Sequence, residues 1–236
     1  MITSQFNKRR QKIGIRQLKM EIEREHGVVI NHKKISRIKK EQGLETKIRK
    51  KRTKWQINQS SAHRVFPNIL NREFKSEYFN EKILTDITQL NYSKDQRAYM
   101  IAYKDTYNKE IISYSVSESM EFGDIKESLE KVAKLKKDQK MLIHSDQGAQ
   151  FTCRKFTKFL EKNEIDQSMS RKGNCWDNAP MESFFGLIKD HLDLDQIESL
   201  SELKKQVEKQ IKYYNYEHPQ IGLKKMSPVE YRRHVA

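Results

Sequence analysis

The feature that most constrains the fold is the order of apolar segments between residues 82 and 191. Three runs rich in apolar or β-branched residues come first, separated by turn-like tetrapeptides, and they predict three antiparallel strands in succession. Helical and strand-like segments then alternate. The strands are expected at 82–90, 98–106, 110–119, 141–143 and 165–170, and the helices at 124–135, around 156–160 and at 181–191. This order predicts an α/β fold with a mixed five-stranded sheet flanked by helices.

Helical periodicity also appears on either side of this region. Between residues 14 and 44, Gly27 is a plausible helix stop and Asn31 a plausible N-cap, which predicts two short helices joined by a turn. This is the arrangement of a helix-turn-helix, although a solvated helical hairpin explains the same spacing equally well. After the sheet region, a capping box at 199–202 predicts a long final helix that stops near His218 and Pro219.

Positive charge is concentrated at the start of the chain. Residues 1–55 contain 18 Lys and Arg but 5 Asp and Glu, a net charge of +13, whereas the rest of the chain carries +2. Such a density favours binding to a polyanion over a merely solvated surface, because basic side chains neutralise phosphates and release their counterions. The second predicted helix and the basic run after it are the expected DNA contacts. Their basic residues are Lys33, Lys34, Arg37, Lys39 and Lys40 in the helix, and Lys47, Arg49, Lys50, Lys51, Arg52 and Lys54 in the run.

The chain gives no indication of export or membrane insertion. Its two cysteines, Cys153 and Cys175, form no CxxC pair, so reduced thiols are expected. No signal-peptide pattern opens the chain and no apolar window reaches the length of a membrane span. We therefore expect a cytoplasmic protein that is neither exported nor embedded in a membrane.

Two aspartates occupy positions next to apolar strand residues, where a carboxylate is unusual and its presence needs an explanation. Asp86 lies inside the first predicted strand among apolar and β-branched residues, and Asp146 directly follows the short strand at 141–143. Ligands collect at such strand ends in mixed sheets, and Gly148 is expected to let the backbone turn closely there. Asp86 on the solvent face of its strand and Asp146 as a turn residue are the ordinary alternatives.

A third acid opens the helix at 181–191. Glu182 suits a first-turn role, either with the helix dipole or in a capping box, and taken alone that role is the better explanation. Lys189 lies two turns further on the same face and could contact a phosphate, although a plain surface lysine fits as well. Asp86, Asp146 and Glu182 together would suit two divalent ions about 3.5–4 Å apart, which activate water and stabilise the leaving oxygen in phosphodiester cleavage. We expect the three carboxyl groups to converge.

Four strings in the chain resemble those of the DDE transposases of bacterial insertion sequences, in particular the second-frame product of the IS-three family, which shares its core with retroviral integrases. The strings are Leu84 to Thr88, His144 to Phe151, Ser170 to Phe185, and Tyr213 to Asn215 with Met226 to Tyr231. The third is long and very specific. Two departures leave the proposed ligands untouched: Ile83 and Leu84 stand where the family usually has a Trp before its first Asp, and His191 ends a string that commonly reads Lys-Asp-Glu.

The resemblance implies an RNase H-like core that uses Asp86, Asp146 and Glu182 as catalytic residues and as ligands of two Mg²⁺ or Mn²⁺ ions. It implies metal-dependent cleavage at the element's ends, followed by direct attack of the freed 3′ hydroxyl on target DNA. Expected DNA contacts are Lys33, Lys34, Arg37, Lys40, Arg171, Lys172 and Lys189. The partners implied are the element's ends and target DNA, further copies of the chain, and a first-frame protein or fusion.

These inferences divide the chain into four parts. A helix-turn-helix-like region covers residues 1–45, a basic linker 46–80, the RNase H-like core 81–195, and a C-terminal helical extension of the core 196–236. Three rival functions stay open: a non-catalytic DNA-binding protein, an inactive truncated transposase, and a nuclease that cuts strands without joining them.

Overall fold

The computed structural model describes residues 1–47, 64–93 and 96–235, with the side chain of Cys175 excepted. Within these residues the chain forms two compact units, Met1–Trp55 with Lys212–Ala236, and Gln56–Ile211. Most of the basic run at 47–54 and half of the turn at 92–95 lie outside the described residues. The expected boundaries of the four parts stay predictions.

The larger unit is built on one mixed sheet of five strands in the order β3-β2-β1-β4-β5. Strands β1, β2 and β3 pair antiparallel, whereas β4 pairs parallel with β1 and β5 pairs parallel with β4. The predicted sheet is therefore confirmed. The strands are β1 (Lys82–Tyr92), β2 (Gln96–Asp105), β3 (Ile111–Ser117), β4 (Leu142–Ser145) and β5 (Asp166–Met169).

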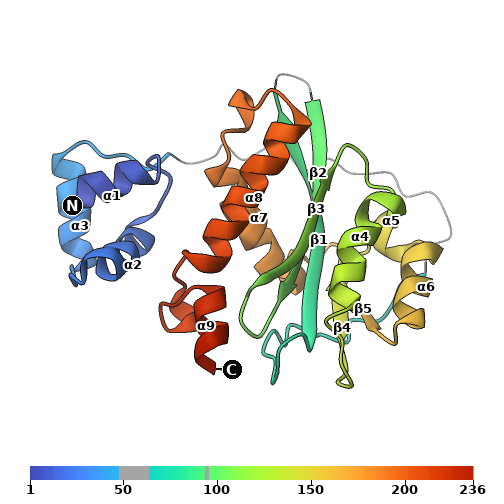
Figure 1. Cartoon of the computed structure of the whole chain (residues 1–236). Helices are drawn as coiled ribbons and strands as arrows, with labels where there is room; N and C mark the ends of the chain where they lie inside the picture. The colour runs from blue at the N-terminus through green and yellow to red at the C-terminus, as the bar shows by residue number, and fades with distance from the viewer. Residues whose placement is uncertain (48–63, 94–95, 236) are drawn as a thin grey trace. The chain divides into compact units, whose positions relative to one another are not determined.

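Helices cover both faces of this sheet. Helices α4, α5 and α6 lie on one face and α7 on the other (Figure 1). A core of buried side chains fills the first face, with Ile83 of β1 packed in the same cluster as Leu129 of α4 and Phe156 of α6. Side chains alternate along a strand, so Leu84 and Asp86 point to the face that α7 covers. The helices are α4 (Phe122–Ala133), α5 (Ala149–Thr152), α6 (Arg154–Lys162) and α7 (Ala179–His191), with short 3₁₀ turns η1 (Cys175–Asn178) and η2 (Leu194–Gln196).

The smaller unit contains the predicted pair of helices, α2 (Ile15–His26) and α3 (His32–Glu41). Gly27 ends α2 in the left-handed conformation with φ of 65°, and the Asn31 side chain caps α3 by accepting a hydrogen bond from the Lys33 backbone N–H at 2.9 Å. Both terminal signals are thus confirmed. These helices share a buried apolar cluster with α1 (Ile2–Lys8), which the sequence analysis did not predict.

The C-terminal segment completes the list of elements. Helix α8 (Leu200–Tyr216) begins after Ser199, whose hydroxyl accepts the Glu202 backbone N–H at 3.2 Å, one of the two bonds of the predicted capping box. The Glu202 carboxylate accepts the backbone N–H of Glu198, at 3.1 Å, instead of that of Ser199. It is followed by η3 (Ile221–Leu223) and α9 (Pro228–Val235). Helix α9 was not predicted, although Ser227 and Glu230 exchange the two hydrogen bonds of a capping box at its start. Among the described residues, no helix has the length and apolar character needed to cross a membrane.

Candidate active site

Strand pairing brings two of the three predicted acids together. The parallel register of β1 and β4 matches Lys82 with Leu142 and Leu84 with His144. Continued by two residues, this register places Asp86 level with Asp146, and neighbouring strands lie about 4.8 Å apart. The prediction that Asp146 follows a strand end is confirmed.

The ionisation of these two side chains reflects their proximity. The Asp86 side chain is half-buried, and its pKa is raised to about 7, first by burial and then by the negative charge of Asp146. The Asp146 side chain reaches the surface, yet the protein packed around its carboxyl group still raises its pKa. One oxygen of each carboxyl group also accepts a backbone N–H, from Ile87 and Gly148 respectively, both at 2.8 Å. These bonds lower the pKa values but do not offset the increase.

Gly148 is needed next to Asp146 for a reason different from the expected one. Its φ of −61° is ordinary for any residue, so no special turn is involved. A Cβ atom at this position would lie 2.8 Å from Asp146 Oδ1. The absence of a side chain therefore leaves room for the Asp146 carboxyl group to accept the Gly148 N–H.

Glu182 approaches the aspartates from α7. The start of this helix is tied to the sheet by two hydrogen bonds: Asn178 Nδ2 donates to the Thr85 carbonyl at 3.1 Å, and Lys104 Nζ donates to the Pro180 carbonyl at 3.2 Å. Asn178 is the N-cap of α7 but makes no side-chain capping bond, because its amide is directed to β1 instead. The exposed Glu182 side chain is close enough to contribute to the raised pKa of Asp86, although its effect is smaller than that of Asp146.

The structure thus gathers an aspartate pair with a glutamate nearby. In the part of the chain that the structure describes, no three His, Cys, Asp or Glu side chains form a ready-made metal-binding group. The half-buried Lys189, on the same helix as Glu182, lowers the pKa of Asp86 through its positive charge. It therefore lies on the site side of α7, as its spacing from Glu182 predicted.

A fourth acid near the site, Asp177, was not predicted from the sequence. Asp177 is fully buried and accepts hydrogen bonds from Asn68 Nδ2 at 3.0 Å, from Arg72 Nε at 2.8 Å and from the backbone and guanidinium of Arg171 at 2.8–3.0 Å. The two arginines, Arg171 first, hold the pKa of Asp177 far below its usual range. No local spacing could have revealed this cluster, because Arg72 lies 105 residues away from Asp177.

The other expected DNA contacts fall into two groups. Lys33, Lys34, Arg37 and Lys40 are exposed on α3, and Arg37 Nε also lies 3.5 Å from Glu41 Oε1. Lys39, between them, is instead buried, with its Nζ 3.8 Å from the centre of the Phe6 ring. Arg171 and Lys172 are exposed before η1, but the Arg171 guanidinium is held by Asp177. Contacts of these residues with DNA stay predictions.

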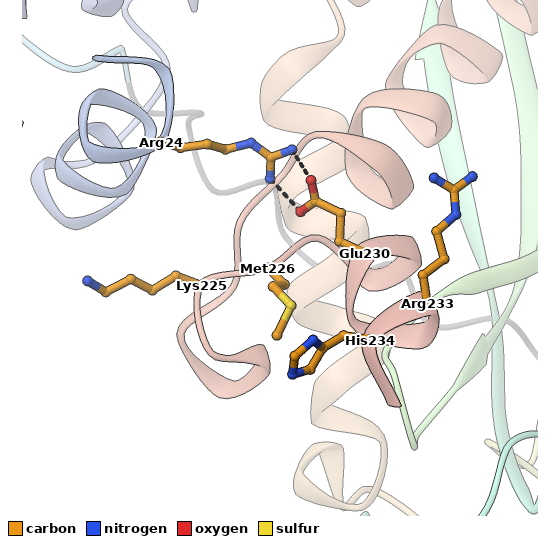
Figure 2. Close-up of a pocket in the computed structure, with 6 residues that line it drawn as sticks. All are labelled: Arg24, Lys225, Met226, Glu230, Arg233 and His234. Atoms are coloured by element: carbon orange, nitrogen blue, oxygen red, sulfur yellow. Dashed lines mark hydrogen bonds and ion pairs between the residues drawn. The ribbon is translucent and has the colours of Figure 1, made fainter. Parts of the chain in front are cut away.

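The smaller unit has a surface pocket of its own. Figure 2 shows Arg24 reaching across it to Glu230, with a distance of 2.7 Å between Nη1 and Oε2. Its lining is mostly basic and contains none of the proposed catalytic acids. It consists of Arg24, Lys225, Met226, Glu230, Arg233 and His234.

Known families match nearly the whole chain. Residues 79–175 and residues 163–228 each match an integrase core domain, and residues 2–52 match an HTH-like domain. These matches agree with the position of the mixed sheet and with the helices of the smaller unit. Proteins with this core depend in general on divalent metal ions.

Relatives with similar sequences come from bacterial insertion sequences. The chain is 36% identical to InsK of insertion sequence element IS150 from Escherichia coli, over 98% of this chain and 81% of the relative. It is 38% identical to a transposase-like protein of Haemophilus influenzae, over 87% of this chain and 94% of the relative. A transposase for insertion sequence element IS904 from Lactococcus lactis is 29% identical, over 88% of this chain and 83% of its own length.

Solved structures confirm the RNase H-like fold. The catalytic core domain of HTLV-2 integrase, in complex with magnesium, superposes with a TM-score of 0.51 at 17% identity, covering 64% of this chain and 95% of that domain. The catalytic core of BIV integrase gives 0.50 at 15% identity, over 66% of this chain and 96% of that core. Identities this low establish the fold alone. The family models and the sequence relatives show that the chain belongs to the IS-three-type transposases of bacterial insertion sequences, a family of polynucleotidyl transferases with an integrase core domain.

Proposed function

We propose that this chain cleaves DNA at the ends of an insertion sequence and joins the freed 3′ hydroxyl to target DNA, with Asp86, Asp146 and Glu182 as its catalytic acids. The observation that carries the proposal is the juxtaposition of Asp86 and Asp146 across neighbouring strands, with the pKa of both carboxyls raised. Two like charges so close together cost free energy, so the two aspartates do not stabilise the fold by their charge. Perturbed acids of this kind cluster at functional sites.

The donor set suits a hard divalent cation. Carboxylate oxygens are the ligands that Mg²⁺ and Mn²⁺ prefer, and a cation next to Asp86 and Asp146 would lower the pKa of both. We propose that these two residues bind two Mg²⁺ or Mn²⁺ ions and that the exposed Glu182 side chain turns toward them as the third ligand. When bound, such ions supply an activated water and stabilise the leaving oxygen.

The chain's own groups then position the DNA. Lys189, whose positive charge acts on Asp86 from α7, is proposed to contact a phosphate next to the reacting one. The exposed basic residues of α3 are proposed to bind another part of the DNA, as the second helix of a helix-turn-helix does. Lys172 is proposed as a further phosphate contact. The expected self-association and first-frame partner stay predictions from family resemblance.

The decisive experiment uses the full chain and a DNA duplex that carries the sequence flanking its own gene. We expect nicked DNA and, with a target duplex added, joined product when Mg²⁺ or Mn²⁺ is present, and neither product in EDTA. Asp146→Ala should bind the DNA but form neither product.

Each rival function gives a different result in the same assay. Nicked DNA without joined product would indicate a simple nuclease. DNA binding without cleavage by the unmutated chain, with either metal, would contradict the proposal and favour a non-catalytic DNA-binding protein or an inactive copy.

A further inference from the structure

A large aromatic side chain is exposed next to the candidate active site. Trp176 lies in η1, the turn that leads directly into α7, and 69% of its surface is exposed. Exposing an indole forgoes the hydrophobic free energy that its burial would give. Trp is enriched at binding interfaces, because its ring system combines a large apolar body with a polar N–H group.

The backbone around Trp176 is held firmly by its neighbours. Asp177, the next residue, is fully buried and bound by Arg72 and Arg171. Asn178 is also buried, and its side-chain amide donates to the Thr85 carbonyl at 3.1 Å. Trp176 is thus displayed on a fixed turn rather than on a free loop, so its position relative to the sheet is defined.

The same contacts place Trp176 close to the aspartates. Thr85, which accepts the hydrogen bond from Asn178, immediately precedes Asp86. Two residues of chain, from Asn178 to Trp176, span at most about 7 Å. The Asn178 side chain, its 3.1 Å hydrogen bond to Thr85 and the step to Asp86 add about 10 Å, and stacked bases are about 3.4 Å apart, so Trp176 lies within about five nucleotides of Asp86.

The surroundings of Trp176 are those of a nucleic-acid contact. Lys172 is exposed in the same loop, and Lys189 acts on Asp86 from the following helix. Proteins that hold single strands combine basic side chains along the backbone with aromatic rings on which bases stack. Enzymes that do chemistry on a base of duplex DNA likewise hold the unstacked base against aromatic or apolar side chains.

We propose that Trp176 stacks on an unpaired base of the DNA strand, within about five nucleotides of the phosphodiester bond held at Asp86 and Asp146. This inference rests on the proposed function and adds a positioning residue to it. Stacking would hold the end of the element open and fix its 3′ terminus for the attack on target DNA.

The first test is a double-mutant cycle that combines the substitution of Trp176 with the removal of single bases from the DNA. Trp176→Ala should lower joining by about 5- to 150-fold, the range expected for one base–aromatic stack, whereas Trp176→Phe should retain most of the joining. DNA duplexes that lack one base at a time around the cleavage site are then compared. At the position that stacks, loss of the base should reduce joining by the unmutated chain, and Trp176→Ala should have no further effect. Additive losses at every position would overturn the proposal.

A second test does not require turnover. The chain has two tryptophans, so Trp55→Phe leaves Trp176 as the reporting fluorophore. With Asp146→Asn added to keep the DNA uncut, a duplex with a short single-stranded 3′ tail of mixed sequence should quench the fluorescence. A matched duplex with an abasic tail should bind with little quenching. Equal quenching by the two duplexes would contradict stacking.

The outcomes separate this inference from the proposed function. Cleavage and joining by the unmutated chain with no loss in Trp176→Ala would leave the transposase activity standing and refute the stacking. A change in self-association of Trp176→Ala, measured by sedimentation, without the base-specific loss would indicate a contact between protein chains and would also refute it. Absence of cleavage by the unmutated chain would refute the proposed function, while the fluorescence test would still decide the stacking.

Discussion

Each unit of the chain contains a carboxyl group enclosed by protein, and the surroundings shift the pKa of the two groups in opposite directions. In the smaller unit, Glu21 is 2% exposed and accepts hydrogen bonds from Gln5 Nε2 at 2.9 Å, Arg9 Nε at 2.8 Å and the Tyr213 hydroxyl at 2.6 Å. Burial alone would raise its pKa, but these donors outweigh burial and lower it. In the larger unit, burial raises the pKa of Asp86 and the nearby Asp146 raises it further.

The difference separates a structural acid from a functional one. Glu21 has the charge and hydrogen-bond partners that a buried carboxylate needs in the folded chain. Asp86 faces another acid, so its ionised form is disfavoured until a cation arrives. The free energy that the fold forgoes at Asp86 is therefore available for metal binding, and variants at the two positions should respond in opposite directions.

The largest expected effect is on catalysis. Asp86→Asn should lower DNA cleavage by about 1000-fold or more, equivalent to about 4 kcal/mol of barrier, because an amide cannot replace a carboxylate as a metal ligand. Glu21→Gln should leave the rate of DNA cleavage within about 10-fold of that of the unmutated chain, provided that it is measured below the unfolding temperature. Initial rates on one DNA substrate test this contrast. Similar losses in the two variants would mean that Asp86 is structural.

The next effect concerns the stability of the smaller unit. Glu21→Ala should destabilise it by about 3 kcal/mol, because Arg9 and Tyr213 lose their buried acceptor. The lowered pKa of Glu21 gives the sign: its contribution is present above the unfolded pKa near 4.5 and disappears as pH falls through the lower folded value. Urea unfolding at pH 7 and at pH 4 measures the difference. An equal loss at the two pH values would contradict the ionic role.

The third effect has the opposite sign. Without metal, Asp86→Asn should stabilise the larger unit by on the order of 2 kcal/mol at pH 8, about half of what three pKa units would give. Because the folded pKa of Asp86 is raised to about 7, the unmutated chain is stabilised below about pH 4 and loses that contribution as pH rises through 7. The advantage of Asp86→Asn should therefore appear between these values. Thermal melts of the two chains at pH 4 and pH 8 without metal measure this advantage, and a pH-independent difference would refute the charge argument. Adding Mg²⁺ should stabilise the unmutated chain more than the variant in such melts.

Most of the fold follows from short-range signals in the chain. The strand runs, the Gly27 stop and the Asn31 cap all predicted elements that the structure confirms. Three short helices were missed for physical reasons. Helices α1 and α5 have 7 and 4 residues, too few for a clear apolar period. Helix α9 begins at Pro228 and has 8 residues, so its main local signal is the capping box of Ser227 and Glu230.

The candidate site is less accessible to such reasoning. Asp86 and Asp146 stand out because each is an acid in or after an apolar strand, and parallel strands bring such positions level. The anchoring of α7 depends on pairs distant in sequence, such as Asn178 with Thr85 and Asp177 with Arg72, 93 and 105 residues apart. Sequence spacing carries no signal for these, because they form only once the sheet and α7 are packed together. The role of Gly148 was likewise steric rather than conformational.

The smallest expected effect concerns Gly148, whose missing side chain leaves room for the Asp146 carboxyl group. In Gly148→Ala the new methyl group would lie 2.8 Å from Asp146 Oδ1, so the carboxyl group must rotate away and lose the backbone hydrogen bond that now orients it. Because the φ of −61° suits alanine and the displaced atom ends a short side chain, stability should change by less than about 1 kcal/mol. Cleavage should fall by about 10-fold, since a misplaced ligand weakens the metal site without removing its charge. Gly123→Ala is the matched control, as nothing lies within 4 Å of its Cβ position. Equal rates for the two variants would show that this contact does not set the orientation of Asp146. A loss confined to Gly148→Ala would show that the fold orients the Asp146 carboxyl group for the metal before the metal binds.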